Sequence, residues 1–291
     1  MRRRRAEACT DHQCVQGEGI RVDARTGELI WVDIAGGALH RGTPSSGSIA
    51  VEVLEIGRRA AMVAPLPIGT DGWVVASERD LLHVRSDGTW EVVVGDITPD
   101  GRRPLNDGVC ALDGALWVGS QSAPRIPDST LYRIVPGRPP ERVLSGVTVS
   151  NGIAFAPDGA TMYYVDTLPR RALEALTIDG GRITDRRTLA EFGVGNPDGI
   201  ALDDEGCVWV ALWDAAEVHR VSPDGTIREV VEVPARRPTA VALHADTLYI
   251  TTARLGLHNP TDEDGLLFAV AVGVSAPPAI PWAWTPEKRA Q

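Results

Sequence analysis

Residues 196–213 read NPDGIALDDEGCVWVALW, and their pattern of apolar and turn residues indicates the secondary structure. A short apolar run, GIAL, is followed by the turn sequence DDEG and by a second apolar run that holds Trp209. Asp and Gly are favoured in tight turns between strands because both tolerate a positive φ angle. The stretch therefore predicts an antiparallel β-hairpin, with Asp198 at the start of its first strand.

The same arrangement recurs along the chain, with an aromatic residue in each second apolar run. These aromatic residues are Trp31, Trp73, Trp117, Tyr164, Trp209 and Tyr249. Successive positions are 42, 44, 47, 45 and 40 residues apart. A period of about 40 to 50 residues, with about four short strands in each unit, is typical of a β-propeller blade. We predict an all-β fold, a six-bladed β-propeller whose aromatic residues pack between blades; two stacked β-sandwiches are the alternative.

The repeats also predict the domain organisation. Six periods fill residues 18–272, so we expect residues 1–291 to form a single propeller domain. The segment EACTDHQCV (7–15) is expected to close the ring by pairing with the sheet that contains LYITT (248–252) and GLLFAVAV (265–272). Residues 1–8, with Arg2 to Arg5, are expected to be a flexible, solvated N-terminal tail. Residues 277–291 are expected to be a C-terminal tail, either loose or an outer strap.

Composition excludes several classes of partner. The chain has 29 basic and 39 acidic residues and a net charge of −10, which repels the phosphate backbone of nucleic acid. No apolar run reaches the roughly 18 residues that suggest a membrane span, so no membrane partner is expected.

Four cysteines without a C-x-x-C pair indicate free, packed thiols and a cytoplasmic location. The six histidines are dispersed without H-E-x-x-H spacing, and we expect most of them at the surface or on edge strands.

Polar residues precede or begin the first strand of most repeats, at positions that equivalent blades direct toward a common axis. They are Glu18 in QGEGIRV, Asn106 and Asp107 in LNDGVCA, Asn151 in SNGIAFA and Asp198 in PDGIALD, against Ala60 or Ala61 and Thr239 in the other two. Turn chemistry explains any one of them alone, since Asn and Asp are common before strands. Together they predict crowded oxygens that need a cation. Two carboxylates and an amide carbonyl suit one divalent ion, with calcium expected and magnesium, manganese or zinc as alternatives.

Several of these motifs resemble the senescence-marker-protein, gluconolactonase and regucalcin-like family. The shared motifs are GEG (17–19), NDG (106–108), SNGIAFAPDG (150–159) and PDGIALDDEGCVWVA (197–211), and the resemblance extends over about residues 14–272. It implies a six-bladed propeller and metal-dependent hydrolysis of sugar lactones. It further implies that Glu18, Asn151 and Asp198 bind the metal and that Asp198 transfers protons. Asn106 would bind the substrate, and Asp107 would support its loop.

The sequence departs from the family pattern near the expected substrate site. Pro104 stands where the family commonly has an arginine that contacts substrate oxygens, and the neighbouring Arg103 would point elsewhere. The segment GSQSAPRIPDS (119–129) is expected to form a lid, from which Arg125 would bind substrate in place of the lost arginine. The identity of the lactone, the native metal and the oligomeric state stay open.

Two other functions are compatible with the same residues. One is a non-catalytic propeller scaffold in which the metal stabilises the ring, because fold alone does not determine function. The other keeps the metal site but applies it to a different biosynthetic substrate.

Overall fold

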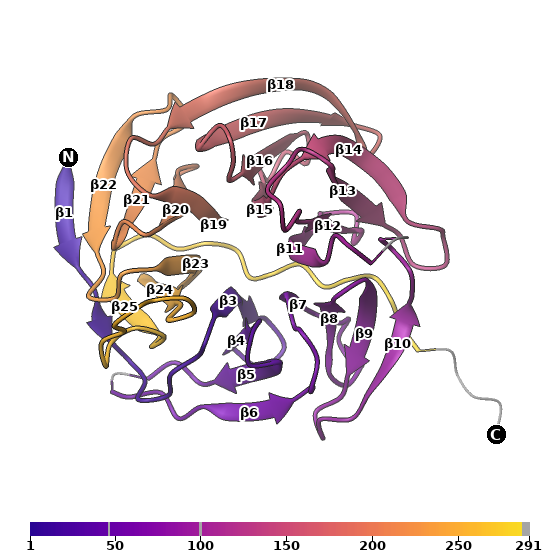
Figure 1. Ribbon diagram of the computed structural model, residues 1–291, viewed down its shortest axis with the longest axis horizontal. Coiled ribbons are helices and arrows are strands. Elements are labelled where there is room, and N and C mark those ends of the chain that lie inside the picture. The colour runs from indigo at the N-terminus through magenta and orange to yellow at the C-terminus, as the bar shows by residue number, and fades with distance from the viewer. Residues whose placement is uncertain (46, 99–100, 287–291) are drawn as a thin grey trace.

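The computed structural model describes residues 1–45, 47–98 and 101–286, and none of these residues is helical. They form six antiparallel sheets arranged in a ring (Figure 1), which confirms the predicted six-bladed β-propeller. Accordingly, the described residues contain no helix that could span a membrane. The predicted aromatic residues all lie on the second strand of their blades.

The first three blades follow one another along the chain, each with four strands. Blade 1 contains β3 (Gly17–Asp23), β4 (Glu28–Asp33), β5 (Ala38–Gly42) and β6 (Glu52–Glu55). Blade 2 contains β7 (Met62–Pro65), β8 (Trp73–Ser77), β9 (Asp80–Val84) and β10 (Trp90–Val94). Blade 3 contains β11 (Leu105–Cys110), β12 (Leu116–Ser120), β13 (Ser129–Ile134) and β14 (Glu141–Val147).

Of the remaining blades, blades 5 and 6 each include one strand from the N-terminus. Blade 4 contains β15 (Ser150–Phe155), β16 (Thr161–Asp166), β17 (Ala172–Asp179) and β18 (Arg182–Glu191). Blade 5 contains β19 (Asn196–Leu202), β20 (Val208–Trp213), β21 (Glu217–Val221), β22 (Ile227–Glu232) and β1 (Arg2–Arg5). Blade 6 contains β23 (Pro238–His244), β24 (Thr247–Thr252), β25 (Phe268–Ala271) and β2 (Glu7–Ala8).

The N-terminus closes the ring, but it does so with more chain than the sequence predicted. As expected, β2 pairs antiparallel with β25 and completes blade 6. The expectation of a flexible tail over residues 1–8 is wrong, because β1 pairs in parallel with β22 as a fifth strand of blade 5. Acidic residues of β22 attract the arginines: Arg4 binds Glu229, and Arg3 Nη1 lies 2.9 Å from the Oε1 of Glu232.

Apolar side chains fill the space between neighbouring blades. One cluster, for example, joins Ile30 and Val32 of β4 to Val63 of β7 and Val75 of β8. Equivalent clusters lie between each of the other neighbouring pairs of blades. Each blade is therefore buried on both faces only because the ring is closed.

Two glycines let the inner strands approach closely at the axis. A Cβ atom added to Gly152 would lie 2.6 Å from the carbonyl oxygen of Asp198 in the next blade. One added to Gly199 would lie 2.8 Å from the carbonyl oxygen of Thr239, again in the next blade. Any side chain at these positions would push neighbouring inner strands apart, and the polar residues beside them would separate.

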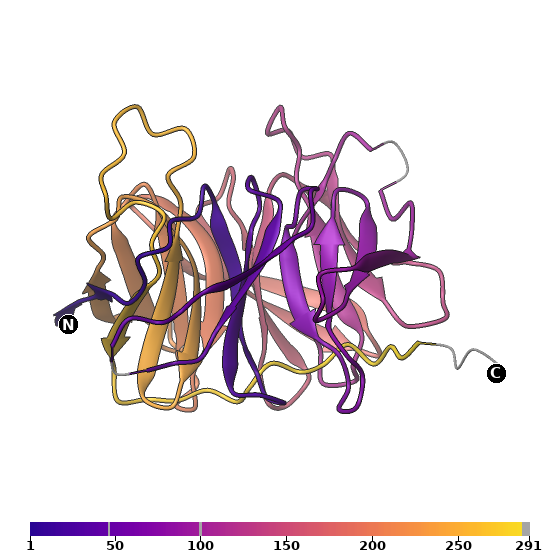
Figure 2. The same ribbon diagram turned by 90° about the horizontal axis from the view of Figure 1, so that it is seen from below.

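The C-terminal segment crosses the face of the ring opposite to the starts of the first strands (Figure 2). Backbone hydrogen bonds join it to four blades: Asp204 N to Ser275 O, Ala279 N to Val22 O, Trp282 N to Pro65 O and Ala283 N to Gly114 O. The side chain of Trp282 is completely buried. Up to residue 286, therefore, the segment is a strap; residues 287–291 of the expected tail lie outside the described residues.

Candidate active site

The inner strands carry irregularities at the positions where the polar residues occur. The pairing register with the second strand shifts between Glu18 and Arg21 in β3, and between Leu105 and Gly108 in β11. It shifts likewise between Ser150 and Ile153 in β15, and between Pro197 and Ile200 in β19. Such bulges redirect side chains that a regular strand would hold in alternation. In blade 2, whose corresponding residues are alanines, β7 pairs with β8 without a shift.

Three carboxylates are buried together at the axis. Glu18, Asp107 and Asp198 are each at most 5% exposed. Burial raises the pKa of Glu18 to about 8, and the negative charge of Asp107 adds to the rise. Burial also raises the pKa of Asp198 well above its usual value, and Glu18 and then Asp107 raise it further. The three carboxylates come from three different blades and are close enough that the negative charge of one raises the pKa of another.

Asp198 has spare hydrogen-bonding capacity. Its Oδ1 is buried and has no hydrogen-bond partner among the described residues. Leaving a carboxylate oxygen unpaired in a buried site is costly, so this atom is a candidate ligand for a cation or a substrate group.

A chain of amide and hydroxyl groups lies beside the carboxylates. Asn106 Nδ2 donates to Asn151 Oδ1 over 2.7 Å and to the carbonyl oxygen of Ser150 over 2.9 Å. Asn151 Nδ2 donates to Thr167 Oγ1 over 2.7 Å, and that hydroxyl donates to Pro197 O over 2.8 Å. Both nitrogens are therefore held in place, and the Oδ1 of Asn151 faces Asn106.

Two arginines that the sequence reasoning missed complete the charge balance. Arg21 Nη2 reaches from blade 1 to Asp107 Oδ1 at 3.3 Å and donates to Gly108 O at 2.9 Å. Arg59 Nη2 lies 3.5 Å from Asn106 Oδ1, and its buried Nε has no partner among the described residues. Burial lowers the pKa of Arg59, while the charge of Glu18 opposes this. The sequence RRAAMVA could have indicated Arg59, because this arginine directly precedes the two alanines at the axial position of blade 2.

The structure therefore brings together most of the predicted site residues. Glu18, Asn106, Asp107, Asn151 and Asp198 are all buried on the first strands of blades 1, 3, 4 and 5. In contrast, Thr239 of blade 6 donates to Gly17 O over 2.5 Å and ties the last blade to the first.

The segment expected to form a lid begins beside the axial residues, because Gln121 N donates to Pro104 O over 3.0 Å and Ser122 N donates to Thr148 O over 2.9 Å. Arg125 is exposed, and its side chain makes no hydrogen bond or ion pair with any of the described site residues. Arg103, next to Pro104, forms an ion pair with Asp128 of the same lid segment. Of the cations described here, the one that contacts the Asn106 side chain is Arg59.

The residues at the axis fit a divalent cation. Two carboxylates with raised pKa values, an unpartnered oxygen on Asp198 and the amide oxygen of Asn151 form an all-oxygen donor set. Hard cations such as calcium and magnesium prefer such donors. A dication would offset the repulsion between Glu18 and Asp198.

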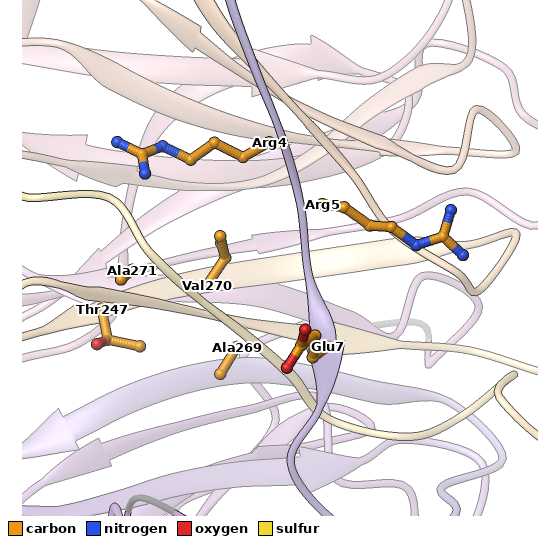
Figure 3. Close-up of a pocket in the computed structure, with 7 residues that line it drawn as sticks. All are labelled: Arg4, Arg5, Glu7, Thr247, Ala269, Val270 and Ala271. Atoms are coloured by element: carbon orange, nitrogen blue, oxygen red, sulfur yellow. The ribbon is translucent and has the colours of Figure 1, made fainter.

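A groove elsewhere on the molecule lacks such chemistry. It lies at the outer rim between β1 and β25 (Figure 3) and is lined by Arg4, Arg5, Glu7, Thr247, Ala269, Val270 and Ala271. This groove holds a single carboxylate, that of Glu7, and it lies on outer strands, whereas the buried cluster lies on the first strands of the blades. We therefore assign the candidate site to the axis.

Comparison with known proteins identifies the family. The SMP-30/Gluconolactonase/LRE-like region family matches residues 16–254. The chain belongs to this family. It is 33% identical over 262 residues to the 6-deoxy-6-sulfogluconolactonase of Pseudomonas putida, covering 84% of the chain and 87% of the relative. It is 31% identical over 261 residues to the L-arabinolactonase of Azospirillum brasilense, covering 87% and 85%.

Solved structures agree on the fold. A calcium-binding protein, the regucalcin of Agrobacterium tumefaciens strain C58, superimposes with a TM-score of 0.88. The match covers 97% of this chain and 99% of that protein, at 24% identity. The solved regucalcin structure therefore has the same propeller fold as this chain. The curated relatives of the chain include sugar lactonases.

Proposed function

We propose that the protein is a metal-dependent lactonase that hydrolyses sugar lactones. In this proposal Glu18, Asn151 and Asp198 bind one divalent cation at the axis, with calcium favoured by the all-oxygen donors. The observation that carries the proposal is the buried, unpartnered Oδ1 of Asp198 beside Glu18. The lactonase names of the relatives at 31–33% identity support the reaction type.

The reaction adds water to the lactone carbonyl carbon, breaks the ring C–O bond and yields a hydroxy acid. A cation bound at this site would polarise the carbonyl and lower the pKa of the attacking water. Asp198 would accept the proton of that water and return it to the ring oxygen as it leaves. Asn106 and Arg59 would orient the lactone, and Asp107, which accepts from Arg21 and Gly108, would hold the strand that carries Asn106.

The charge of the site favours negative charge on the substrate. Glu18 and Asp198 offset a dication, and Arg21 offsets Asp107, which leaves the positive charge of Arg59. A net positive site stabilises the oxyanion that develops on the carbonyl. It would also favour a lactone with an anionic substituent, in line with the sulfonated sugar named for the Pseudomonas putida relative.

The test is removal of the Asp198 carboxylate. We expect Asp198→Asn to lower the turnover of a panel of sugar lactones by about 10²–10⁴-fold, the usual contribution of a proton-transfer group. Asp185→Asn is the matched control, because Asp185 is exposed on the outer strand β18 and the chemical change is the same. A folded Asp198→Asn variant that hydrolyses every lactone at the rate of the control would contradict the assignment.

Chelation separates this proposal from a scaffold role. If the protein is a metal-dependent lactonase, removing divalent cations should abolish hydrolysis, and adding calcium back should restore it. A large fall in melting temperature without hydrolysis in either state would instead indicate a non-catalytic scaffold.

A further inference from the structure

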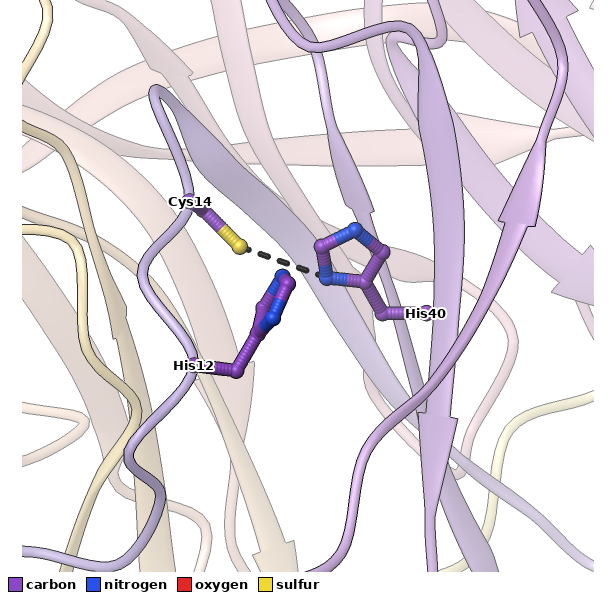
Figure 4. Close-up of side chains that lie close together, drawn as sticks. All are labelled: His12, Cys14 and His40. Carbon is purple, nitrogen blue, oxygen red and sulfur yellow. Dashed lines mark hydrogen bonds between the residues drawn. The ribbon is translucent and has the colours of Figure 1, made fainter.

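A second group of metal-binding side chains lies away from the axis. His12, Cys14 and His40 each direct a ligand atom toward the others (Figure 4), and these atoms all lie within 4.8 Å of one another. Cys14 Sγ is 3.3 Å from His40 Nδ1, and the ring centroids of His12 and His40 are 4.8 Å apart. Cys14 and His40 are buried, whereas His12 is half-buried.

We propose that these three residues form a binding site for zinc or a similar transition metal, separate from the site at the axis. One thiolate and two imidazoles are ligands that zinc prefers, and they differ from the oxygen donors at the axis. This proposal does not depend on the proposed lactonase activity.

The geometry is close to that of a zinc site. Zinc bonds of about 2.3 Å to sulfur and about 2.0 Å to nitrogen place tetrahedral S and N ligands about 3.5 Å apart. Cys14 and His40, at 3.3 Å, already meet this requirement. His12 belongs to an irregular segment between β2 and β3, so a shift of about 1 Å would bring its ring into the same sphere.

The surroundings of the cluster suit a bound cation. The Asp33 carboxylate accepts hydrogen bonds from the backbone N–H groups of Val15 at 2.6 Å and Gln16 at 2.9 Å, which fixes the chain beside Cys14. Burial lowers the pKa of His40 to about 4, against the opposing charge of Asp33, so the imidazole is neutral and able to bind a metal. Burial raises the pKa of the Cys14 thiol to about 12, and the negative charge of Asp33 adds to the rise, so a cation bound beside the sulfur would be needed to favour the thiolate. The thiolate and Asp33 together offset the two charges of zinc, and the supporting contacts resemble the outer partners that orient ligands in metal sites.

The position of the cluster indicates what the metal would do. The segment that carries His12 and Cys14 runs between the last and first blades: Cys9 N donates to Leu267 O at 2.9 Å, and Cys14 N donates to Gly265 O at 2.8 Å. His40 belongs to β5 of blade 1. A metal bound to all three residues would fasten the closing segment to blade 1 and stabilise the closed ring by its binding free energy.

Cobalt(II) is the probe for this site, because a cobalt–thiolate bond gives a near-ultraviolet charge-transfer band. We expect cobalt added to the metal-free, full-length protein to produce the band, and zinc to displace it. Cys14→Ser should abolish the band, and His12→Ala should weaken cobalt binding at least about tenfold. Cys9→Ser is the matched control for the thiol, and Glu18→Gln is the control for the axis; both should keep the band.

Melting temperature gives an independent readout. Zinc should raise the melting temperatures of the wild-type protein and of Cys9→Ser. It should raise the melting temperature of His12→Ala much less. The proposal is overturned if the folded wild-type protein shows no charge-transfer band with excess cobalt, or if the band persists in Cys14→Ser. If Cys14→Ser does not fold, His12→Ala decides, because this half-buried side chain can be removed with little effect on the core; unchanged cobalt affinity there would overturn the proposal.

Discussion

Asn106 Nδ2 lies 2.7 Å from Asn151 Oδ1, and this hydrogen bond joins the inner strands of blades 3 and 4 at the axis. The acceptor is the atom that we propose as a metal ligand. Because Asn106 also donates to Ser150 O, it fixes both the amide of Asn151 and the backbone that carries it.

The first prediction is that Asn106 positions the ligand as well as the substrate. Asn106→Ala would leave two buried acceptors unpaired, so we expect calcium affinity to fall about 10–100-fold and kcat/KM to fall with it. Calorimetric titration of the metal-free variant measures the affinity. Asn259→Ala, at an exposed loop position, should change neither quantity. Unchanged affinity in a folded Asn106→Ala variant would restrict this residue to the substrate.

The second prediction concerns pH and metal. The pKa of Glu18 is raised from 4.5 to about 8, so the folded protein binds this proton more tightly than the unfolded chain does. In the metal-free protein the contribution of Glu18 to the free energy of unfolding should therefore fall as the pH rises from about 4.5 to 8, because Glu18 ionises first in the unfolded chain. Calcium should raise the melting temperature more at pH 8 than at pH 5, since it competes with the proton.

Thermal melts in chelator and in calcium across this pH range measure the effect. Glu18→Gln should remove the Glu18 contribution to the pH dependence in chelator and reduce the calcium shift. Burial lowers the pKa of His40 to about 4, so His40 contributes a rise in stability up to about pH 6.5, and the Glu18 contribution is read from the difference between the wild-type protein and Glu18→Gln. An identical pH dependence of the two proteins in chelator would show that Glu18 is not protonated in the folded state.

The third prediction concerns Arg59 as the cation that faces the substrate. Its unpartnered Nε and its contact with Asn106 leave it able to bind an anionic group. Arg59→Met keeps much of the apolar stem and removes the charge, so we expect a rise in KM of about 10–100-fold for a sulfonated lactone, since charged hydrogen bonds contribute about 1.5–3 kcal/mol. Arg182→Met is the matched control, because Arg182 is exposed on the outer strand β18. Equal effects of Arg59→Met on neutral and anionic lactones would indicate a role in orientation without charge selection.

The fold and much of the axial site were predictable because their signals are local. An aromatic strand and a Gly-containing turn recur within each blade, and the periodicity places Glu18, Asn151 and Asp198 at equivalent positions. The bulges of β3, β15 and β19 then turn these side chains toward the axis. A bulge is a local feature, because it is formed by a few neighbouring residues of the strand.

Features that depend on distant partners were not predictable. The four N-terminal arginines suggest a free tail until Glu229 and Glu232 of β22 are placed beside them. The expectation of surface histidines fails for His40, His83 and His219, which are buried. His40 meets Cys14 only because the closing segment lies against blade 1. Arg59 was missed because its long side chain reaches the axis from outside the strand.

The last prediction concerns the C-terminal strap. Trp282 is fully buried between blades 2 and 3, its Nε1 donates to Ile134 O at 3.3 Å, and its ring stacks on Trp284 with centroids 5.8 Å apart. Trp282→Ala should lower the free energy of unfolding by about 3–5 kcal/mol, as for other buried aromatic residues, which urea denaturation measures. Trp90→Ala, at a residue of the outer strand β10 that is 36% exposed, should lower the free energy of unfolding by less. Hydrolysis by the folded Trp282→Ala variant should stay near the wild-type rate, because the strap crosses the face opposite to the starts of the inner strands. A loss of stability no larger than that of Trp90→Ala would show that the strap does not fasten the blades.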